Sequence, residues 1–266
     1  MNIDDPSNRW LIHPLGRALL PLMIRHEVTP NMVSLCGLGF GFMAAMAYTA
    51  WASPFWATTG LLLMIAWHVA DGLDGILARA TGQFSEAGRL LDGICDYTTF
   101  ILVYLVIAAN TPPETHSVNH VLVWVAGLFH AVQAALYEAE RERYHRRMRG
   151  DPATDWQVSS IGGRGEALYA NVRMLFENSA RRFDALHNRA NGIEAFHRYT
   201  VFAGPTMRWM TLLGANARTL AIWLSCLAGD PALFWWWEIL VLSPLTLLFI
   251  ARLRFIERRA GKLATS

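Results

Sequence analysis

The chain has 266 residues, of which 53% are hydrophobic and 17% charged, and its formal net charge is +2. Soluble domains usually carry charge on about a quarter of their residues, whereas nucleic-acid-binding domains carry a clear excess of Lys and Arg. The composition therefore points away from a soluble enzyme and gives no ground for a nucleic-acid partner.

The first 28 residues predict an amphipathic helix that lies in the membrane surface. Between Trp10 and Arg25, leucines alternate with basic residues, so one face is apolar and the other positively charged. Pro14 and Pro21 are expected to break or bend this helix, because proline lacks the N–H that a helix interior uses.

Six apolar stretches predict six transmembrane helices, since about 20 apolar residues suffice to cross a ~30 Å hydrocarbon core. Thr29 is the predicted N-cap of the first helix, with Pro30 at its first helical position. The predicted spans cover about residues 30–51, 55–79, 88–109, 118–137, 205–228 and 233–253. The expected fold class is an all-α integral membrane bundle, with a juxtamembrane amphipathic helix before it.

The spans divide the chain into parts that differ in composition. They are an interfacial segment (1–28), transmembrane helices 1–4 (29–138), a cytoplasmic helical insert (139–204), transmembrane helices 5–6 (205–254) and a basic tail (255–266). The insert carries an apolar stripe at helical spacing, formed by Leu168, Val172, Leu175, Phe176, Phe183 and Leu186. We expect a helix packed on the membrane surface or on the protein itself; a lid over a substrate entrance is the alternative.

Basic residues gather at one set of helix ends. Five arginines follow the fourth span, and four arginines with Lys262 lie at or beyond the end of the sixth. The connections near residues 53, 114 and 230 contain neither Lys nor Arg. The positive-inside rule then places both termini on the cytoplasmic side, at the inner membrane if the source is bacterial.

Four aspartates lie at helical spacing where the second span ends and the third begins. Asp71 and Asp74 share one helix face, and Asp92 and Asp96 share a face of the next helix. An ionisable residue in a membrane helix costs roughly 2.5–3.5 kcal/mol on insertion scales, so it marks a candidate functional site. Helix capping would explain Asp92 and Asp96 but not the other pair. Two carboxylate pairs on adjacent helices predict a site for hard cations.

The aspartates belong to a longer pattern. The segment reads Asp-Gly-Leu-Asp-Gly-Ile-Leu-Ala-Arg from Asp71 to Arg79, followed by Gly88, Asp92 and Asp96. It resembles the signature of the CDP-alcohol phosphotransferase family, D-x-x-D-G-x-x-A-R, eight residues, then G-x-x-x-D-x-x-x-D. Thr-Pro-Asn at residues 29–31 also resembles the family's entry to its first helix. The close resemblance extends over residues 29–100.

The resemblance implies a role for each matching residue. Asp71, Asp74 and Asp92 would bind two Mg²⁺ or Mn²⁺ ions, and Asp96 would be the general base that also touches the second metal. The implied CDP-binding residues are Asn31, Gly75, Ala78, Arg79 and Gly88. Hard cations about 3.5–4 Å apart can neutralise a diphosphate from both sides, and an arginine can pair with a phosphate.

The resemblance also implies the reaction and its partners. A hydroxyl acceptor attacks a CDP-activated alcohol and CMP leaves, in phospholipid biosynthesis. We favour CDP-diacylglycerol with a small polar alcohol over CDP-choline or CDP-ethanolamine with a lipid acceptor. Asn216 and Arg218, inside the fifth span, are candidates for binding the acceptor or a second phosphate; pairing with a neighbouring acid or a backbone carbonyl is the alternative. A homodimer is a further expectation from the family.

Two other functions compete with this interpretation. A Mg²⁺-dependent membrane prenyltransferase would release pyrophosphate and usually has two separated aspartate-rich motifs, whereas this sequence has one cluster. A cation transporter would place carboxylates near the bilayer midplane, often between broken and repeated helices. Here the carboxylates lie toward the predicted cytoplasmic face and no repeat is evident.

Overall fold

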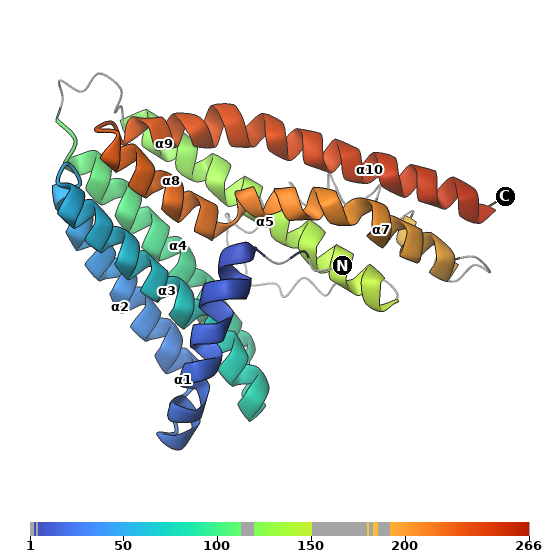
Figure 1. Ribbon diagram of the computed structural model, residues 1–266, viewed down its shortest axis with the longest axis horizontal. Coiled ribbons are helices and arrows are strands. Elements are labelled where there is room, and N and C mark those ends of the chain that lie inside the picture. The colour runs from blue at the N-terminus through green and yellow to red at the C-terminus, as the bar shows by residue number, and fades with distance from the viewer. Residues whose placement is uncertain are drawn as a thin grey trace. The chain divides into compact units, whose positions relative to one another are not determined.

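The computed structural model describes residues 3, 5–112, 120–150, 180, 183–185 and 192–265, and in these residues it is helical without strands (Figure 1). The helices are α1 (His13–Arg25), α2 (Pro30–Ala47), α3 (Pro54–Thr81), α4 (Glu86–Ala109), α5 (His120–Arg149), α7 (Gly192–Met210), α8 (Ala215–Leu227), α9 (Ala232–Trp237) and α10 (Ser243–Thr265). Short π or 3-10 turns at Asn8–Ile12, Tyr48–Ala50, Thr211–Leu213 and Glu238–Leu242 adjoin them.

The chain folds as two compact units. The aspartate unit comprises Asp4–Gly127 and Ala215–Trp237, and the C-terminal unit comprises Met1–Ile3, Leu128–Gly214 and Glu238–Ser266. In the aspartate unit α2 packs against both α3 and α4. This antiparallel arrangement brings the start of α2, the end of α3 and the start of α4 to the same end of the unit (Figure 1).

Local chemistry fixes where these helices begin and end. The Thr29 side chain accepts a hydrogen bond from the Met32 N–H at 3.3 Å, which confirms the predicted N-cap of α2. The Ser85 hydroxyl caps α4 by accepting from the Gly88 N–H at 2.9 Å. Gly82 ends α3 in the left-handed region, with φ of 69°, where a side chain would be strained.

Small residues let α2 approach its neighbours closely. A Cβ built on Gly41 would lie 2.4 Å from the Thr99 hydroxyl of α4, so only glycine fits there. A Cβ on Gly37 would lie 3.3 Å from the Ala70 side chain of α3. Small residues at helix contacts are typical of membrane bundles, where close backbone approach replaces a hydrophobic driving force.

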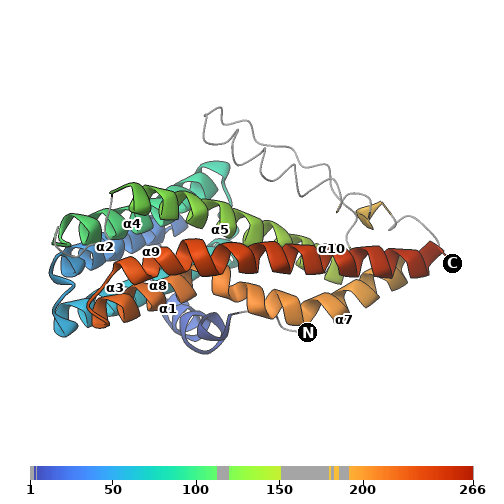
Figure 2. The same cartoon turned by 90° about the horizontal axis from the view of Figure 1, so that it is seen from above.

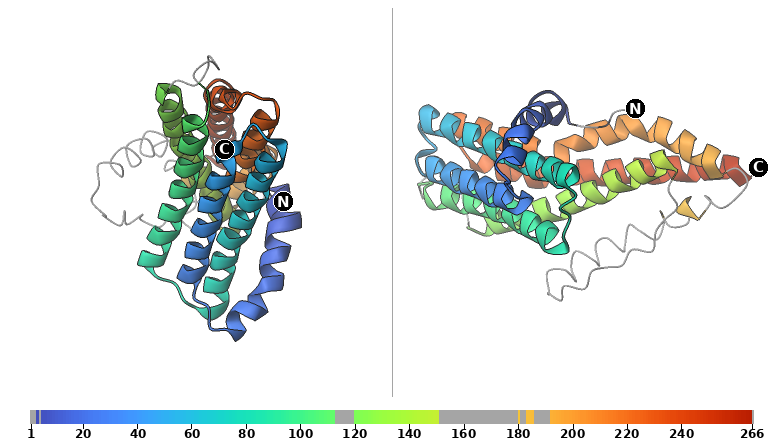
Figure 3. Two further views of the ribbon diagram at one scale, coloured as in Figure 1. Left: turned by 90° about the vertical axis from the view of Figure 1, so that its left-hand side faces the viewer. Right: turned by 90° about the horizontal axis from the view of Figure 1, so that it is seen from below.

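The predicted N-terminal helix is present as α1, which packs alongside α3 (Figure 3). The contact runs through Gly16, since a Cβ there would lie 3.3 Å from Ile76. Pro21 lies inside the helix and does not end it. Leu15, Leu22 and other apolar side chains of α1 remain exposed, as expected for an amphipathic helix that contacts lipid.

Helices α2, α3, α4, α5 and the stretch from Ala232 to Lys262 are each long and apolar enough to cross a membrane, and α7 with α8 passes the same test as a pair. The predicted fifth span, 205–228, falls on this bent pair of helices. Pro205 lies within α7, which begins at Gly192, and the helix breaks at Gly214, whose ψ of 165° is extended. The helix that contains the predicted fourth span continues beyond residue 137, because α5 ends at Arg149.

The C-terminal unit contains α7 and α10 side by side (Figure 2). A buried ionic network holds it together: Arg147 of α5 donates to Asp184 and to Glu257 of α10, each at 2.7 Å. Arg254 donates to Glu257 and to Glu140, and Glu140 also accepts from Arg143 at 2.5 Å.

The predicted insert is described only in part. Phe183 is buried and stacks on Phe196 of α7 at 5.5 Å between ring centroids, and the Arg147 guanidinium lies 4.8 Å from its ring. At this one position of the predicted stripe, the side chain packs on the protein itself. The other stripe residues, Leu168, Val172, Leu175, Phe176 and Leu186, lie outside the described residues.

Candidate active site

The predicted carboxylates converge at one end of the aspartate unit. Asp71 and Asp74 lie near the end of α3, and Asp92 lies in the first turns of α4. One carboxylate oxygen from each lies within 4.8 Å of the others. The helical spacing in the sequence thus becomes a compact group of three acids, and carboxylates this close repel one another unless a cation or protons intervene.

Asp74 is the most enclosed of the three and is held by a residue of α2. The Ser34 hydroxyl donates to Asp74 Oδ2 at 2.6 Å, and both residues are 6% exposed. Ser34 was not identified from the sequence as a site residue. The available signal was its position on the Thr29–Pro30–Asn31 entry to α2, where it lies one turn after Asn31 and therefore on the same face.

Asp96 lies one turn beyond Asp92 on α4 and is partly buried. Its carboxyl interacts with that of Asp71, and it experiences the charges of Asp74 and Asp92. Asp96 is therefore beside the compact group of three rather than within it. Asp96 is thus an additional acid next to a group of three carboxylates that is already complete without it.

The residues implied for CDP binding surround the same end of the helices. The Arg79 guanidinium folds across Gly75, since a Cβ on Gly75 would lie 3.4 Å from Arg79 Nη1. A Cβ on Gly88 would lie 3.0 Å from Asn31 Oδ1, so α2 approaches the start of α4 at that point. Ala78 is partly buried and Arg79 exposed. An exposed guanidinium at this end of the helices suits a phosphate-containing ligand.

The predicted acceptor residues lie on α8, which packs against α3. Arg218 is fully buried. Asn216 donates to Asn8 Oδ1 at 2.7 Å and so ties α8 to the N-terminal segment. His68, one turn before Asp71, shares a 3.0 Å hydrogen bond with Thr219. Their part in acceptor binding stays a prediction.

The ligand atoms of this site fit a hard divalent cation. All three side chains of the compact group offer carboxylate oxygens, which Mg²⁺ and Mn²⁺ prefer, and no cysteine or histidine belongs to this group of described residues. The hydrogen bond from Ser34 orients Asp74, as hydrogen bonds from neighbouring residues commonly orient metal-binding carboxylates.

Comparison with known proteins agrees with this geometry. Residues 27–159, half of the chain, match the sequence model of the family described as CDP-alcohol phosphatidyltransferase. Among curated proteins, the chain is similar to a CDP-diacylglycerol–serine O-phosphatidyltransferase from Encephalitozoon cuniculi (strain GB-M1), with 33% identity over 109 residues. That match covers 38% of this chain and 28% of the relative's length. The family match extends well past the motif and includes all four aspartates and Ser34, so this chain belongs to the CDP-alcohol phosphatidyltransferase family.

Proposed function

We propose that the protein transfers a phosphatidyl group from CDP-diacylglycerol to the hydroxyl of a small alcohol, with release of CMP. The observation that carries the proposal is the convergence of Asp71, Asp74 and Asp92 within 4.8 Å, inside the segment that matches the family. The name of the curated relative makes serine the first acceptor to test.

The compact carboxylate group would hold divalent ions. Asp71, Asp74 and Asp92 would supply its oxygens, and Asp96, whose carboxyl interacts with that of Asp71, would also contact a second ion. When bound there, Mg²⁺ or Mn²⁺ would neutralise the charge on the diphosphate oxygens. Ser34 keeps the buried Asp74 carboxylate in place, so the ligand geometry exists before substrate arrives.

The remaining residues supply position and proton transfer. The exposed Arg79 guanidinium would pair with a phosphate, and Gly75 leaves room for that guanidinium beside the α3 backbone. The acceptor oxygen bonds to the phosphorus that carries the lipid, while the bond from that phosphorus to the CMP oxygen breaks. CMP leaves with the bond electrons, and Asp96 takes the proton from the acceptor hydroxyl.

The proposal includes an orientation in the membrane. The arginines in the C-terminal part of α5 and along the end of α10 lie at the same ends of the chain's apolar stretches as the aspartates, so the site and both termini would face the cytoplasm. The partly exposed α1 would then lie at the cytoplasmic membrane surface, beside the end of α3.

A CMP-release assay tests the proposal. Purified protein is given CDP-diacylglycerol and, in parallel, serine, glycerol phosphate, inositol phosphate or choline, with Mn²⁺ or Mg²⁺ and with EDTA. One acceptor should yield CMP and phospholipid in equal amounts, only when divalent ions are present. Product formed in EDTA would refute the metal site. CMP release with CDP-choline and diacylglycerol, but not with CDP-diacylglycerol and any small alcohol, would show that the acceptor carries the lipid and not the CDP-alcohol.

A further inference from the structure

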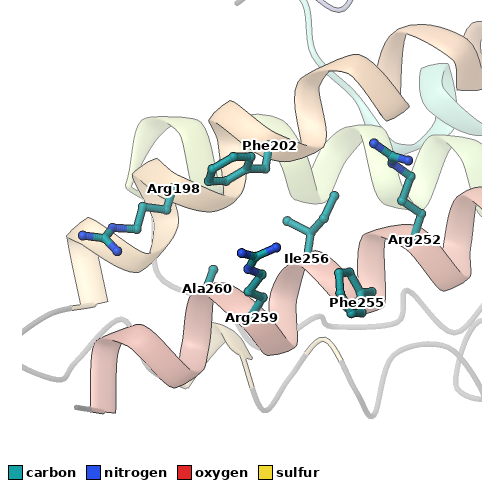
Figure 4. A pocket seen from close by; sticks show the side chains of 7 residues that line it. All are labelled: Arg198, Phe202, Arg252, Phe255, Ile256, Arg259 and Ala260. Atoms are coloured by element: carbon teal, nitrogen blue, oxygen red, sulfur yellow. The ribbon is translucent and has the colours of Figure 1, made fainter.

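A groove opens between α7 and α10 in the C-terminal unit, with a cavity volume of about 560 Å³. Its walls include Arg198, Phe202, Arg252, Phe255, Ile256 and Arg259. Figure 4 shows Arg259 extending from α10 toward Phe202 of α7, with Arg198 and Arg252 at opposite ends of the groove. The groove thus combines three guanidinium groups with aromatic and aliphatic walls. Both helices lie outside residues 27–159, so the family match does not account for it.

The groove has an excess of positive charge. Arg252 and Arg259 are exposed, and within the described residues neither forms an ion pair with a carboxylate. Arg254, between them on α10, is instead turned into the buried network with Glu257. Arg198 pairs with Glu194 through Nε at 2.7 Å, which leaves the net charge of the groove positive. Guanidinium groups in this arrangement favour a phosphate-containing anion.

The walls favour a ligand with an apolar part. Phe202 and Phe255 are each 63% exposed and stand beside the guanidinium groups. A free phosphate ion would leave these rings uncovered, whereas an acyl chain would bury them and gain roughly 25 cal/mol per Å² of apolar surface. Guanidinium groups beside exposed aromatic rings therefore favour a ligand that has both a negatively charged group and an apolar chain.

The position along α10 agrees with a lipid headgroup. Leu247 and Leu248 are about 60% exposed and belong to the apolar stretch of the helix, and Arg252 follows one turn later. Arg258, Arg259 and Lys262 continue the basic end of the same helix. Arginines that end a membrane-spanning stretch lie at headgroup depth, where basic pockets between helices bind anionic lipids.

We propose that this groove binds an anionic phospholipid, with its phosphodiester between Arg252 and Arg259 and an acyl chain against Phe202 and Phe255. A phosphatidylglycerol molecule has the required negative charge and acyl chains, whereas phosphatidylcholine has the same chains without net charge. The site would therefore distinguish lipids by headgroup charge. It is separate from the carboxylate group on α3 and α4, and lipid retention needs no CDP-alcohol.

Native mass spectrometry of delipidated full-length protein tests this site. The protein is titrated with phosphatidylglycerol, with phosphatidylcholine, and with glycerol 3-phosphate as the lipid-free anion. Phosphatidylglycerol should bind, and the double variant R252Q/R259Q should weaken its binding about thirtyfold, as expected for two basic groups near an anionic headgroup. The matched control Arg258→Gln removes the neighbouring charge of α10, which does not line the groove, and should bind as the wild type does.

A second pair of variants tests the apolar wall. Phe202→Ala should weaken phosphatidylglycerol binding, whereas Leu248→Ala, an exposed position on α10 outside the groove, should not. If Arg258→Gln loses as much phosphatidylglycerol affinity as the double variant, the lipid is attracted to the basic surface in general, and the proposed site is refuted. Equal affinity for glycerol 3-phosphate, or for phosphatidylcholine, would also overturn the proposal. Because no nucleotide is present, none of these outcomes bears on the proposed transfer reaction.

Discussion

Ser34 on α2 donates a 2.6 Å hydrogen bond to Asp74 on α3, and both side chains are buried. Ser34→Ala removes the donor and leaves Asp74 Oδ2 without its partner. We expect metal affinity or turnover to fall roughly tenfold to a hundredfold, as for other residues that orient metal ligands. The measurement is CMP release against Mn²⁺ concentration. Thr59→Ala, which removes an exposed hydroxyl bonded to its own helix, is the control; an unchanged Mn²⁺ dependence in Ser34→Ala would refute this role.

Asp96→Asn tests whether Asp96 acts as the general base and not mainly as a metal ligand. The amide cannot accept the proton from the acceptor hydroxyl, so turnover should fall by roughly 10²–10⁴-fold, the usual contribution of a general base. Binding of the CDP-alcohol should stay largely intact, because Asp96 lies beside the compact group. Equilibrium binding of the nucleotide is measured alongside turnover, with Glu86→Gln on α4 as the control. A normal rate, or loss restored by excess Mn²⁺, would contradict the role of Asp96 as the base.

Gly88 and Gly93 of α4 allow a controlled comparison, because a side chain would meet neighbouring atoms at the first position and open space at the second. A Cβ on Gly88 would lie 2.9 Å from Ser85 Oγ and 3.0 Å from Asn31 Oδ1, whereas one on Gly93 would meet nothing within 4 Å. Gly88→Ala should therefore displace Asn31 and raise the KM for the CDP-alcohol several-fold. Gly93→Ala should leave KM unchanged and stabilise the helix by up to about 1 kcal/mol. Steady-state kinetics compares the two variants, and an equal KM would exclude Asn31 and Gly88 from the nucleotide site.

Glu257→Gln tests the buried network of the C-terminal unit. Glu257 is 3% exposed and accepts hydrogen bonds from both Arg147 and Arg254. Removing its charge leaves two buried guanidinium groups undercompensated, which typically costs about 3–5 kcal/mol. Thermal unfolding in detergent should show a lower Tm. Glu138→Gln breaks an exposed pair with Arg141 and should leave Tm nearly unchanged; equal shifts in both variants would mean that the network adds no specific stability.

The aspartate group could be predicted because its information is local. Asp71 and Asp74 lie one turn apart, as do Asp92 and Asp96, and their motif is contiguous in sequence. Ser34 could not be found in this way, because a single hydroxyl in an apolar helix has no periodicity and its partner lies 40 residues away.

The break at Gly214 was missed for a different reason. One extended residue hardly changes a hydropathy average over 205–228, so such an average cannot show where the helix breaks. The ionic network was missed because Arg147 and Glu257 lie in stretches rich in charged residues, which predict exposure to solvent. Their burial depends on α5 and α10 continuing beyond the apolar stretches and packing in the C-terminal unit.

The number of residues between the Ser85 cap and Asp92 sets which face of α4 carries the acid. A helix advances by about 100° for each residue, so inserting one residue between these two positions would rotate Asp92 away from Asp71 and Asp74 while Ser85 still caps the helix. No replacement of an individual acid could restore the group afterwards. This length is therefore under the same constraint as the identity of the aspartates, and a deletion within it should be as damaging as the loss of a ligand.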